Sequence, residues 1–382
     1  MEKTEENITK VNNHYFFEEF TFKKNKFIGH SKGEELEFAD NVVWIDNFFL
    51  IFQIKERNIK DSKGFENWFK SKILRKAVQQ IKKTIEYLNK YETIPIENEK
   101  GFTFDIAEAK NINPLKLIVY DPGDSFAVEL RNMKFYNSKD IGNIHLLHIE
   151  DYKQICEFLI TPFEIDEYLR FRELLQRANP KTLSTIPEQY ILKHYFIDHT
   201  NLSIDKSYLQ NNLNVLVNLP EFDISRIIKN FNKRIIDTTA EDSYYYIIKE
   251  LAKMNRSDLE SFKIRYSLAL KKAKSQELDF PYRMISLLSE CGYVFIPCLF
   301  EHKNNIKNLL RNFLDMHMYD QKLNKAIGMI TYFNPIEKDH YVLWNYIYKY
   351  WEEDKEYEKI IYKNFPLREM KVERVSRYNL EQ

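Results

Sequence analysis

Residues 37–57 constrain the fold of this chain most, because two apolar runs rich in β-forming residues flank a polar pair, Asp46-Asn47. A two-residue turn of this type between apolar runs predicts a β-hairpin. In that hairpin Ile45 pairs with Phe48, and the rest of the register follows by counting outward from the turn. The apolar run 48–52 further indicates a strand that is buried in a sheet.

The polar residues of this stretch fall at the open end of the predicted hairpin. The register sets Asp40 opposite Gln53 and makes Lys55 the diagonal neighbour of Asp40. Side chains alternate between the two faces of a strand, so all three residues share one face. The sequence therefore predicts that a carboxylate, an amide and an ammonium group converge beside an apolar stripe.

An acid followed by Gln-x-Lys on the next strand resembles the catalytic core of the PD-(D/E)XK nuclease superfamily, and the glutamine form is similar to Mrr-like restriction endonucleases. The resemblance covers roughly the first 150 to 175 residues. It implies a restriction-endonuclease-like α/β domain, with a mixed sheet flanked by helices. Asp40 would then bind a metal ion, Gln53 would replace the second acid, and Lys55 would lie next to the reacting phosphate.

The implied cofactor is Mg²⁺ or Mn²⁺, held by Asp40, Gln53 and the backbone carbonyl of Ile54. Glutamine supplies an oxygen ligand without a charge, so a further carboxylate is expected at the site. Four nearby glutamates are candidates, and the sequence does not choose among them: Glu18, Glu19, Glu35 and Glu37.

A long amphipathic helix is predicted over residues 66–90, where apolar residues recur at helical spacing. The region from 55 to 90 is strongly basic although the whole chain has no net charge. These basic residues fit phosphate contacts or a solvated lysine face equally well. By the family resemblance, Gln80 corresponds to a polar side chain offered to the active centre. The predicted nucleic-acid-binding residues are Arg57, Lys72, Arg75, Lys76 and Gln80.

The composition and motifs of the chain limit the classes of protein to which it can belong. The chain has 382 residues, enough for two domains with cores of their own. It shows no signal sequence and no membrane-spanning stretch, and its three cysteines are scattered, so a cytoplasmic location and no membrane partner are expected. Phosphate-binding and dinucleotide-binding glycine motifs are absent from the sequence, so any ATPase that drives the system would be a separate protein.

The remaining pattern predicts two domains. Strand signals at residues 102–106, 115–120, 126–130 and 144–149, followed by helices from Asp151 and Thr161, complete an α/β domain over 1–178. Residues 179–188 have the composition of a linker. Beyond them, segments 223–236, 241–254, 256–276, 281–290, 303–318 and 339–365 have helical periodicity, which predicts an all-α domain over 189–382. An aromatic run over 344–361 fits a packed helix face or a base-stacking platform.

These features lead to one principal hypothesis and one alternative. The principal hypothesis is a Mg²⁺-dependent endonuclease that hydrolyses phosphodiester bonds, with DNA as the expected substrate, in bacterial restriction or anti-phage defence. Cutting both strands of a duplex would need two half-sites, so a homo-oligomer is expected. The alternative is a non-catalytic protein with the nuclease fold that binds nucleic acid or recruits a partner through its helical domain, and Gln53 is the residue that keeps it open.

Overall fold

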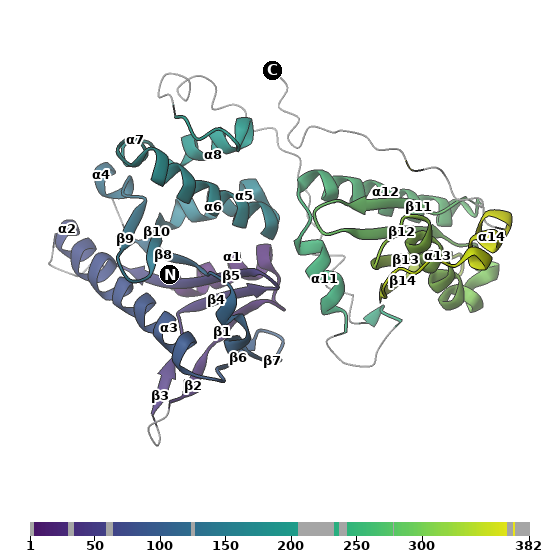
Figure 1. The fold of residues 1–382 in the computed structure, drawn as a ribbon, viewed down its shortest axis with the longest axis horizontal. Coiled ribbons are helices and arrows are strands. Elements are labelled where there is room, and N and C mark those ends of the chain that lie inside the picture. Colours follow the sequence, from purple (N-terminus) through teal and green to yellow (C-terminus); the bar gives the residue numbers. More distant parts are fainter. Residues whose placement is uncertain are drawn as a thin grey trace. The chain divides into compact units, whose positions relative to one another are not determined.

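The chain divides into two units, each built around its own β-sheet (Figure 1). The computed structural model describes residues 4–29, 34–58, 64–123, 127–204, 233–236, 243–277, 279–364 and 370. Residues 1–220 and 380–382 form the first unit, and residues 221–379 form the second. The predicted boundary at residue 178 is therefore too early. Every helix in the described part of the chain is too short or too polar to cross a lipid bilayer.

The first unit has an eight-stranded mixed sheet in the order β7-β6-β1-β4-β5-β8-β10-β9. Its strands are β1 (Thr21–Lys24), β4 (Asn41–Ile45), β5 (Phe48–Glu56), β6 (Pro95–Asn98), β7 (Thr103–Asp105), β8 (Leu115–Asp121), β9 (Phe135–Ser138) and β10 (Gly142–His148). A separate two-stranded hairpin consists of β2 (Lys26–Ile28) and β3 (Glu35–Glu37).

The predicted hairpin is confirmed. β4 and β5 are antiparallel, Ile45 pairs with Phe48, and Asn41 pairs with Phe52. Asp46 of the turn has a φ of 48°, a left-handed conformation that aspartate tolerates better than most residues. β5, β8 and β10 are parallel neighbours, so the carboxyl end of β5 lies in the middle of the sheet.

Helices cover both faces of this sheet. They are α1 (Thr4–Phe16), α2 (Phe65–Trp68), η1 (Phe69–Ala77), α3 (Val78–Lys90), η2 (Ile106–Asn111), α4 (Val128–Arg131), α5 (Ile149–Leu159), α6 (Pro162–Ala178), α7 (Pro180–Leu183) and α8 (Glu188–Asp198). The helix predicted over 66–90 is confirmed as the continuous run of α2, η1 and α3 (Figure 1). Its middle part, η1, is a π-helix, and its buried residues Phe69, Ile73 and Ala77 recur every four positions, which suits the wider turn.

The two faces of the sheet have different helical partners. Phe49 and Ile51 of β5 join Ile73 and other residues of the α2–α3 run in one buried cluster. On the opposite face, Phe52 contacts Tyr152 of α5 at a ring-centroid distance of 5.6 Å. Alternation along β5 therefore assigns Gln53 and Lys55 to the face under the basic helix, as the sequence predicts.

Two local expectations in this unit are wrong. Residues Val128–Arg131 form the short helix α4 where a strand was expected over 126–130, because Glu129, Leu130 and Arg131 are good helix formers. Helix α5 begins at Ile149 and is capped by His148, whose Nδ1 accepts a hydrogen bond from the backbone N–H of Glu150. The expected cap, Asp151, lies inside the helix and pairs with Arg131.

The second unit is not all-α, in contrast to the prediction. It contains a four-stranded sheet in the order β11-β12-β13-β14, with β12 and β13 parallel and the outer pairs antiparallel. The strands are β11 (Tyr282–Ser286), β12 (Cys291–Pro297), β13 (Lys325–Asn334) and β14 (Asp339–Tyr348). The helices are α11 (Tyr245–Ala252), α12 (Arg256–Ser275), η5 (Phe300–Asn305), α13 (Ile306–Asp320) and α14 (Lys355–Asn364).

The physical reason for this error is that the sheet is covered on both faces. Phe262 of α12 packs against Tyr293, Phe295 and Trp344 on one face. On the other face, Val294 and Ile330 form a cluster with residues of α13. Strands buried on both faces, such as β12, lack the polar alternation that marks a strand, and the segments predicted as helices at 281–290 and 339–365 contain the outer strands β11 and β14. The predicted helix at 223–236 falls largely outside the described residues.

One glycine explains how closely α13 approaches this sheet. A Cβ atom at Gly328 of β13 would lie 2.5 Å from the Cδ1 of Leu310 and 2.8 Å from the Cγ of Leu314. Both leucines are fully buried on α13. Only a residue without a side chain therefore allows the helix to sit at this distance.

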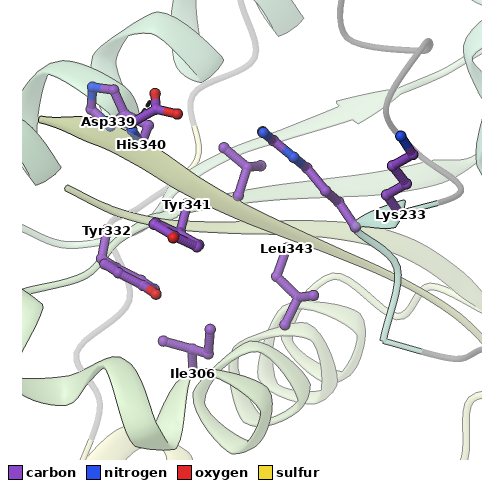
Figure 2. Close-up of a pocket in the computed structure, with 9 residues that line it drawn as sticks. Lys233, Ile306, Tyr332, Asp339, His340, Tyr341 and Leu343 are labelled. Atoms are coloured by element: carbon purple, nitrogen blue, oxygen red, sulfur yellow. Dashed lines mark hydrogen bonds between the residues drawn. The ribbon is translucent and has the colours of Figure 1, made fainter. Parts of the chain in front are cut away.

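A pocket of about 380 Å³ lies at the β13–β14 end of the second unit (Figure 2). Its wall includes Tyr332 and Tyr341 from neighbouring strands and two adjacent basic residues, Lys233 and Arg234. The segment 233–236 runs beside β14, where the N–H of Trp344 donates to the carbonyl of Arg234 at 2.7 Å. The pocket therefore combines residues from the edge of the sheet and from a segment about one hundred positions earlier.

The predicted linker at residues 179–188 is part of the folded first unit. Asn179 precedes α7, whose first residue is Pro180, and Pro187 precedes α8. Proline at the start of a helix is common because its missing N–H has no intrahelical partner there in any case. The prolines that suggested a linker therefore mark the starts of two closely spaced helices. Glu188, the first residue of α8, is buried.

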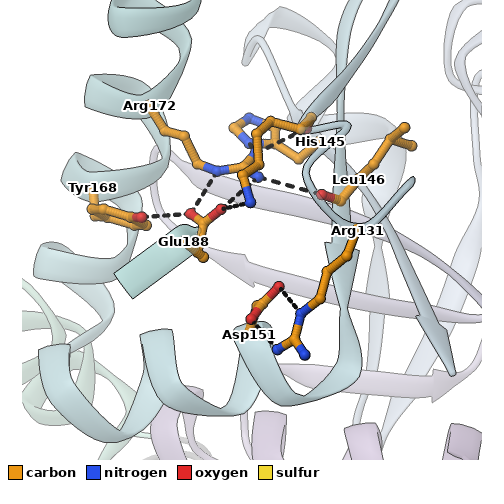
Figure 3. Close-up of polar contacts among 8 residues, drawn as sticks. Arg131, His145, Leu146, Asp151, Tyr168, Arg172 and Glu188 are labelled. Atoms are coloured by element: carbon orange, nitrogen blue, oxygen red, sulfur yellow. Dashed lines mark hydrogen bonds and ion pairs between the residues drawn. The ribbon is translucent and has the colours of Figure 1, made fainter. Parts of the chain in front are cut away.

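Glu188 belongs to a buried ionic network that joins α6 and α8 to the sheet (Figure 3). Arg172 of α6 donates to both carboxylate oxygens of Glu188, at 2.7 and 3.0 Å, and Tyr168 donates to the same carboxylate at 2.5 Å. Arg172 also donates to the backbone carbonyls of Lys134 and Leu146. The network therefore attaches two helices to the β9–β10 side of the sheet.

Titration of this network should make the first unit less stable at mildly acidic pH. Burial lowers the pKa of His145, which contacts Glu173 and Arg172, from 6.5 to about 4. Between these values the unfolded chain binds one more proton than the folded one, so the free energy of unfolding should fall as the pH drops from 6.5 to 4. The expected loss is about 3 kcal/mol. At still lower pH Glu188 contributes a further loss, because Arg172 and Lys134 outweigh its burial and lower its pKa to about 2.

Urea unfolding at pH 7.5, 6 and 5 measures this effect. In a Trp344→Phe, Trp351→Phe background the remaining tryptophans, Trp44 and Trp68, report on the first unit alone. His145→Asn should flatten the pH dependence, and the matched change His14→Gln at an exposed histidine should leave it intact. An identical slope in wild type and His145→Asn would contradict the assignment.

Candidate functional site

Three oxygen atoms at the open end of the β4–β5 hairpin converge on one ammonium group. The Nζ of Lys55 lies 2.8 Å from Asp40 Oδ2, 3.1 Å from Gln53 Oε1 and 2.9 Å from the carbonyl oxygen of Ile54. These are the three groups that the sequence assigned as metal ligands. The structure thus brings together the carboxylate, the amide and the ammonium that the register predicts.

The backbone of β5 fixes the position of the carboxylate. The N–H of Ile54 donates to Asp40 Oδ2 at 2.6 Å, and the N–H of Asp40 donates to the carbonyl of Phe52. Gln53 is only 2% exposed, whereas the side chains of Asp40 and Lys55 are 13% and 14% exposed. Gln53 is therefore the most buried of the three side chains.

This donor set fits a hard cation. Carboxylate, amide and backbone carbonyl oxygens are the ligands that Mg²⁺ and similar ions prefer, and here all three point at one positive charge. The ammonium of Lys55 and a metal ion would compete for the same oxygens. Among the described residues, no group of three or more His, Cys, Asp or Glu side chains is placed to hold a metal ion. A metal ion at this site would therefore need neutral oxygen ligands in addition to Asp40.

Glu37 is the glutamate that the structure associates with Asp40. Its pKa is raised by partial burial and then by the negative charges of Asp40 and Glu5, while Lys26 and Lys55 oppose the rise. Because the charge of Asp40 raises the pKa of Glu37, the two carboxyl groups lie within electrostatic range of each other.

The other three candidate glutamates lie elsewhere. Glu18 and Glu19 precede β1, whose Thr21 pairs with Val43, so they lie toward the turn of the hairpin and away from Asp40. Glu18 forms an ion pair with Lys100. Glu35 forms an exposed ion pair with Lys26 at 3.0 Å.

The basic residues of the predicted interface are on the surface of the α2–α3 run. Lys72, Arg75 and Lys76 are exposed on η1, opposite its buried face. They form one positively charged strip, because residues three and four positions apart share a helix face. Arg57 follows β5, and its guanidinium lies 3.9 Å from the ring centroid of Phe65, the first residue of α2.

Gln80 occupies a partly buried position on α3. Its Oε1 is buried and has no hydrogen-bond partner among the described residues, which include Asp40, Gln53 and Lys55. The next turn of the helix is attached to the strand region, since the hydroxyl of Thr84 donates to the carbonyl of Phe38, two residues before Asp40. Gln80 therefore carries an unsatisfied acceptor on the helix that covers the site.

Sequence reasoning missed two aromatic neighbours of the site. Tyr120 is the register partner of Lys55 on β8, and His148 is the partner of Tyr120 on β10. The ring of Tyr120 contacts those of Phe69 and His148 edge to face, at 5.3 and 5.8 Å. Burial raises the pKa of Tyr120, and burial followed by the charge of Arg131 lowers that of His148.

A signal for these two residues exists in the sequence. Both stand at the ends of predicted strands, 115–120 and 144–149, and parallel strands bring their carboxyl ends to one edge of a sheet, where ligands bind in open α/β folds. The missing step was the parallel alignment of β5, β8 and β10.

Comparisons with known proteins add no assignment to this geometry. The chain matches no protein-family model, no curated protein and no solved structure. The function of the chain is therefore inferred from the chemistry of its own residues.

Proposed function

We propose that this protein is a metal-dependent nuclease that hydrolyses phosphodiester bonds, with DNA as the expected substrate. The observation that carries the proposal is the convergence of Asp40, Gln53 and the Ile54 carbonyl on the ammonium group of Lys55. An acid and Gln-x-Lys on adjacent strands of a mixed, helix-flanked sheet also suit the resemblance to PD-(D/E)XK nucleases.

Each residue has a defined task in this proposal. Asp40, Gln53 and the Ile54 carbonyl would hold Mg²⁺ or Mn²⁺, with Glu37 as the further carboxylate. A bound ion of this type polarises a phosphate oxygen and lowers the pKa of an attacking water. Lys55 would place its charge beside the reacting phosphate, where negative charge builds up in the transition state.

The basic strip on η1 supports a polyanionic substrate. Lys72, Arg75 and Lys76 are exposed together on the helix that covers the face of Gln53 and Lys55. Cations arranged along one helix face neutralise successive phosphates and release counterions, which dominates the affinity of proteins for nucleic acids. A restriction or anti-phage role, a homo-oligomer that cuts both strands, and a separate ATPase partner are further parts of the proposal that rest on the family resemblance and on symmetry.

A second candidate function is a nuclease-fold scaffold that binds nucleic acid without cutting it. The observation that favours it is the position of Lys55, whose ammonium already satisfies the three oxygens. Without a metal ion, the negative charge of Asp40 is already balanced by the positive charge of Lys55. The two candidates therefore differ in whether a metal ion can displace Lys55.

Titration with Mn²⁺ tests the metal site directly. Gln53→Glu should bind Mn²⁺ at least about tenfold more tightly, because an added carboxylate interacts with a nearby cation by several kcal/mol at the effective dielectric of such sites. Gln53→Ala should bind it more weakly because one oxygen is lost. Lys55→Met should also bind more tightly than wild type, because the competing ammonium is gone.

Calorimetry or electron paramagnetic resonance of Mn²⁺ gives these affinities without an activity assay. Gln79→Glu, on the exposed face of α3, is the matched control for a new negative charge and should leave the affinity unchanged. If none of the Gln53 and Lys55 variants changed Mn²⁺ binding, the metal site would be wrong and the scaffold would be preferred.

A further inference from the structure

The pocket of the second unit has the properties of a ligand site that the nuclease proposal does not use. Its volume of about 380 Å³ falls within the usual range for small-molecule sites. The segment 233–236 forms one side of it, because Ile235 bridges to Trp344 in a parallel arrangement. That register places Lys233 beside Val342, one residue from Tyr341.

A pair of stacked tyrosines forms the aromatic wall. Tyr332 and Tyr341 are register partners on β13 and β14, and their rings are parallel with centroids 5.1 Å apart. Phe300 contacts Tyr332 at 6.0 Å and extends the aromatic row. Tyr341 is nonetheless 43% exposed although Tyr332 covers one of its faces, so its other face is available to a flat ring.

Charged groups of both signs lie around this aromatic row, and Glu337 accepts a hydrogen bond from the hydroxyl of Tyr341. Lys233 and Arg234 line the pocket, and Asp339 is the one carboxylate among its lining residues. Beyond the pocket, the Nζ of Lys303 lies 4.2 Å from the ring centroid of Phe300. Adjacent lysine and arginine side chains are well suited to hold a phosphate group.

The floor between the two ends is apolar. Ile306, the first residue of α13, and Leu343 of β14 line it, and Figure 2 shows them with the tyrosine pair on one side of the β14 ribbon and Lys233 on its other side. The aromatic rings, the apolar residues and the two cations therefore line a pocket that extends across the edge strand β14. These groups match the base, sugar and phosphate of a nucleotide.

We propose that this pocket binds a nucleotide, with its base stacked on Tyr341 and its phosphate held by Lys233 and Arg234. The nucleotide is either free or part of a single-stranded nucleic acid, and both present the same base and phosphate. The proposal does not depend on the site at Asp40, which belongs to the other unit.

Binding to the full-length protein in EDTA tests this site, because chelation of metal prevents any cleavage. The probes are adenosine 5′-monophosphate, a ten-residue deoxyadenosine oligonucleotide, adenosine and ribose 5-phosphate, measured by calorimetry. The monophosphate or the oligonucleotide should bind with saturation, and the two fragments, which lack either phosphate or base, should bind more weakly. Binding of the oligonucleotide alone would assign the site to a strand, and comparable binding of both probes would assign it to the single nucleotide.

Variants identify the residues. Tyr341→Leu should weaken binding about 5- to 150-fold, the effect of losing one stacked base, and Tyr341→Phe should retain most of the affinity. Lys233→Gln with Arg234→Gln should weaken the monophosphate far more than adenosine. Tyr348→Leu, at a 57% exposed tyrosine of the same strand, and Lys359→Gln on α14 are matched controls.

Each further outcome has a defined meaning. Retained binding in Asp40→Asn would separate this site from the proposed active site. The absence of saturable binding of both the monophosphate and the oligonucleotide, or equal losses in Tyr341→Leu and Tyr348→Leu, would overturn the proposal.

Discussion

Replacing Asp40 with asparagine should reduce metal-dependent cleavage of nucleic acid by a factor of about 100 to 1,000 while the protein stays folded. Asparagine has nearly the same shape and keeps an oxygen that can accept from the N–H of Ile54. It removes the negative charge that directly contacts Lys55. The expected loss of stability is about 1 to 2 kcal/mol, because a charged hydrogen bond becomes a neutral one in a site that is only 13% exposed.

The measurement is cleavage of plasmid and single-stranded substrates in Mg²⁺ or Mn²⁺, with thermal melting of each protein. Glu35→Gln is the control, because it removes a carboxylate from the neighbouring β2–β3 hairpin, where Glu35 pairs with Lys26 at the surface. Equal residual cleavage by wild type, Asp40→Asn and Lys55→Ala would indicate a contaminating nuclease. Binding of nucleic acid without cleavage by wild type would favour the scaffold.

The largest expected effect on stability comes from Glu188. Its replacement by alanine should lower the free energy of unfolding of the first unit by about 3 to 5 kcal/mol, because Arg172 is left buried without its counter-charge. For a unit of this size, the melting temperature should fall by about 6 to 20 °C. Urea unfolding followed by Trp44 and Trp68 fluorescence measures the change.

Two further variants separate the ionic network from a general loss of packing. Glu35→Ala breaks an ion pair whose partners are 61% and 65% exposed, and it should cost at most about 1 kcal/mol. Arg172→Met and Lys134→Met combined with Glu188→Leu replace the three buried charges with apolar groups and should recover much of the lost stability. A cost for Glu188→Ala no greater than for Glu35→Ala would contradict this account.

The sequence predicted the hairpin and the helix at residues 66–90 because both are encoded locally. The Asp46-Asn47 turn fixes a register that carries as far as Asn41 and Phe52, and the apolar spacing over residues 66–90 needs no distant partner. The choice of Glu37 over Glu18 could not be made in this way. It depends on where β1 and the β2–β3 hairpin are placed, which only the tertiary structure reveals.

The second unit shows the opposite situation. All seven residues of β12 are buried, so the strand lacks the polar alternation that would distinguish it from a helix. The Arg172–Glu188 pair was equally hidden, because nothing in the sequence separates these two charges from the many that lie on the surface. Their burial results from the packing of α6 and α8 against the sheet.

Lys55 cannot hold the three oxygen atoms of the site and contact a substrate phosphate at the same time. Its ammonium is already bound by Asp40, Gln53 and the Ile54 carbonyl. In the nuclease proposal, the lysine becomes free to act only when another cation takes over those oxygens. Without a metal ion, the folded chain would remain inactive, with the charges of Asp40 and Lys55 balanced. Binding of a metal ion would at the same time release the Lys55 side chain to contact the substrate.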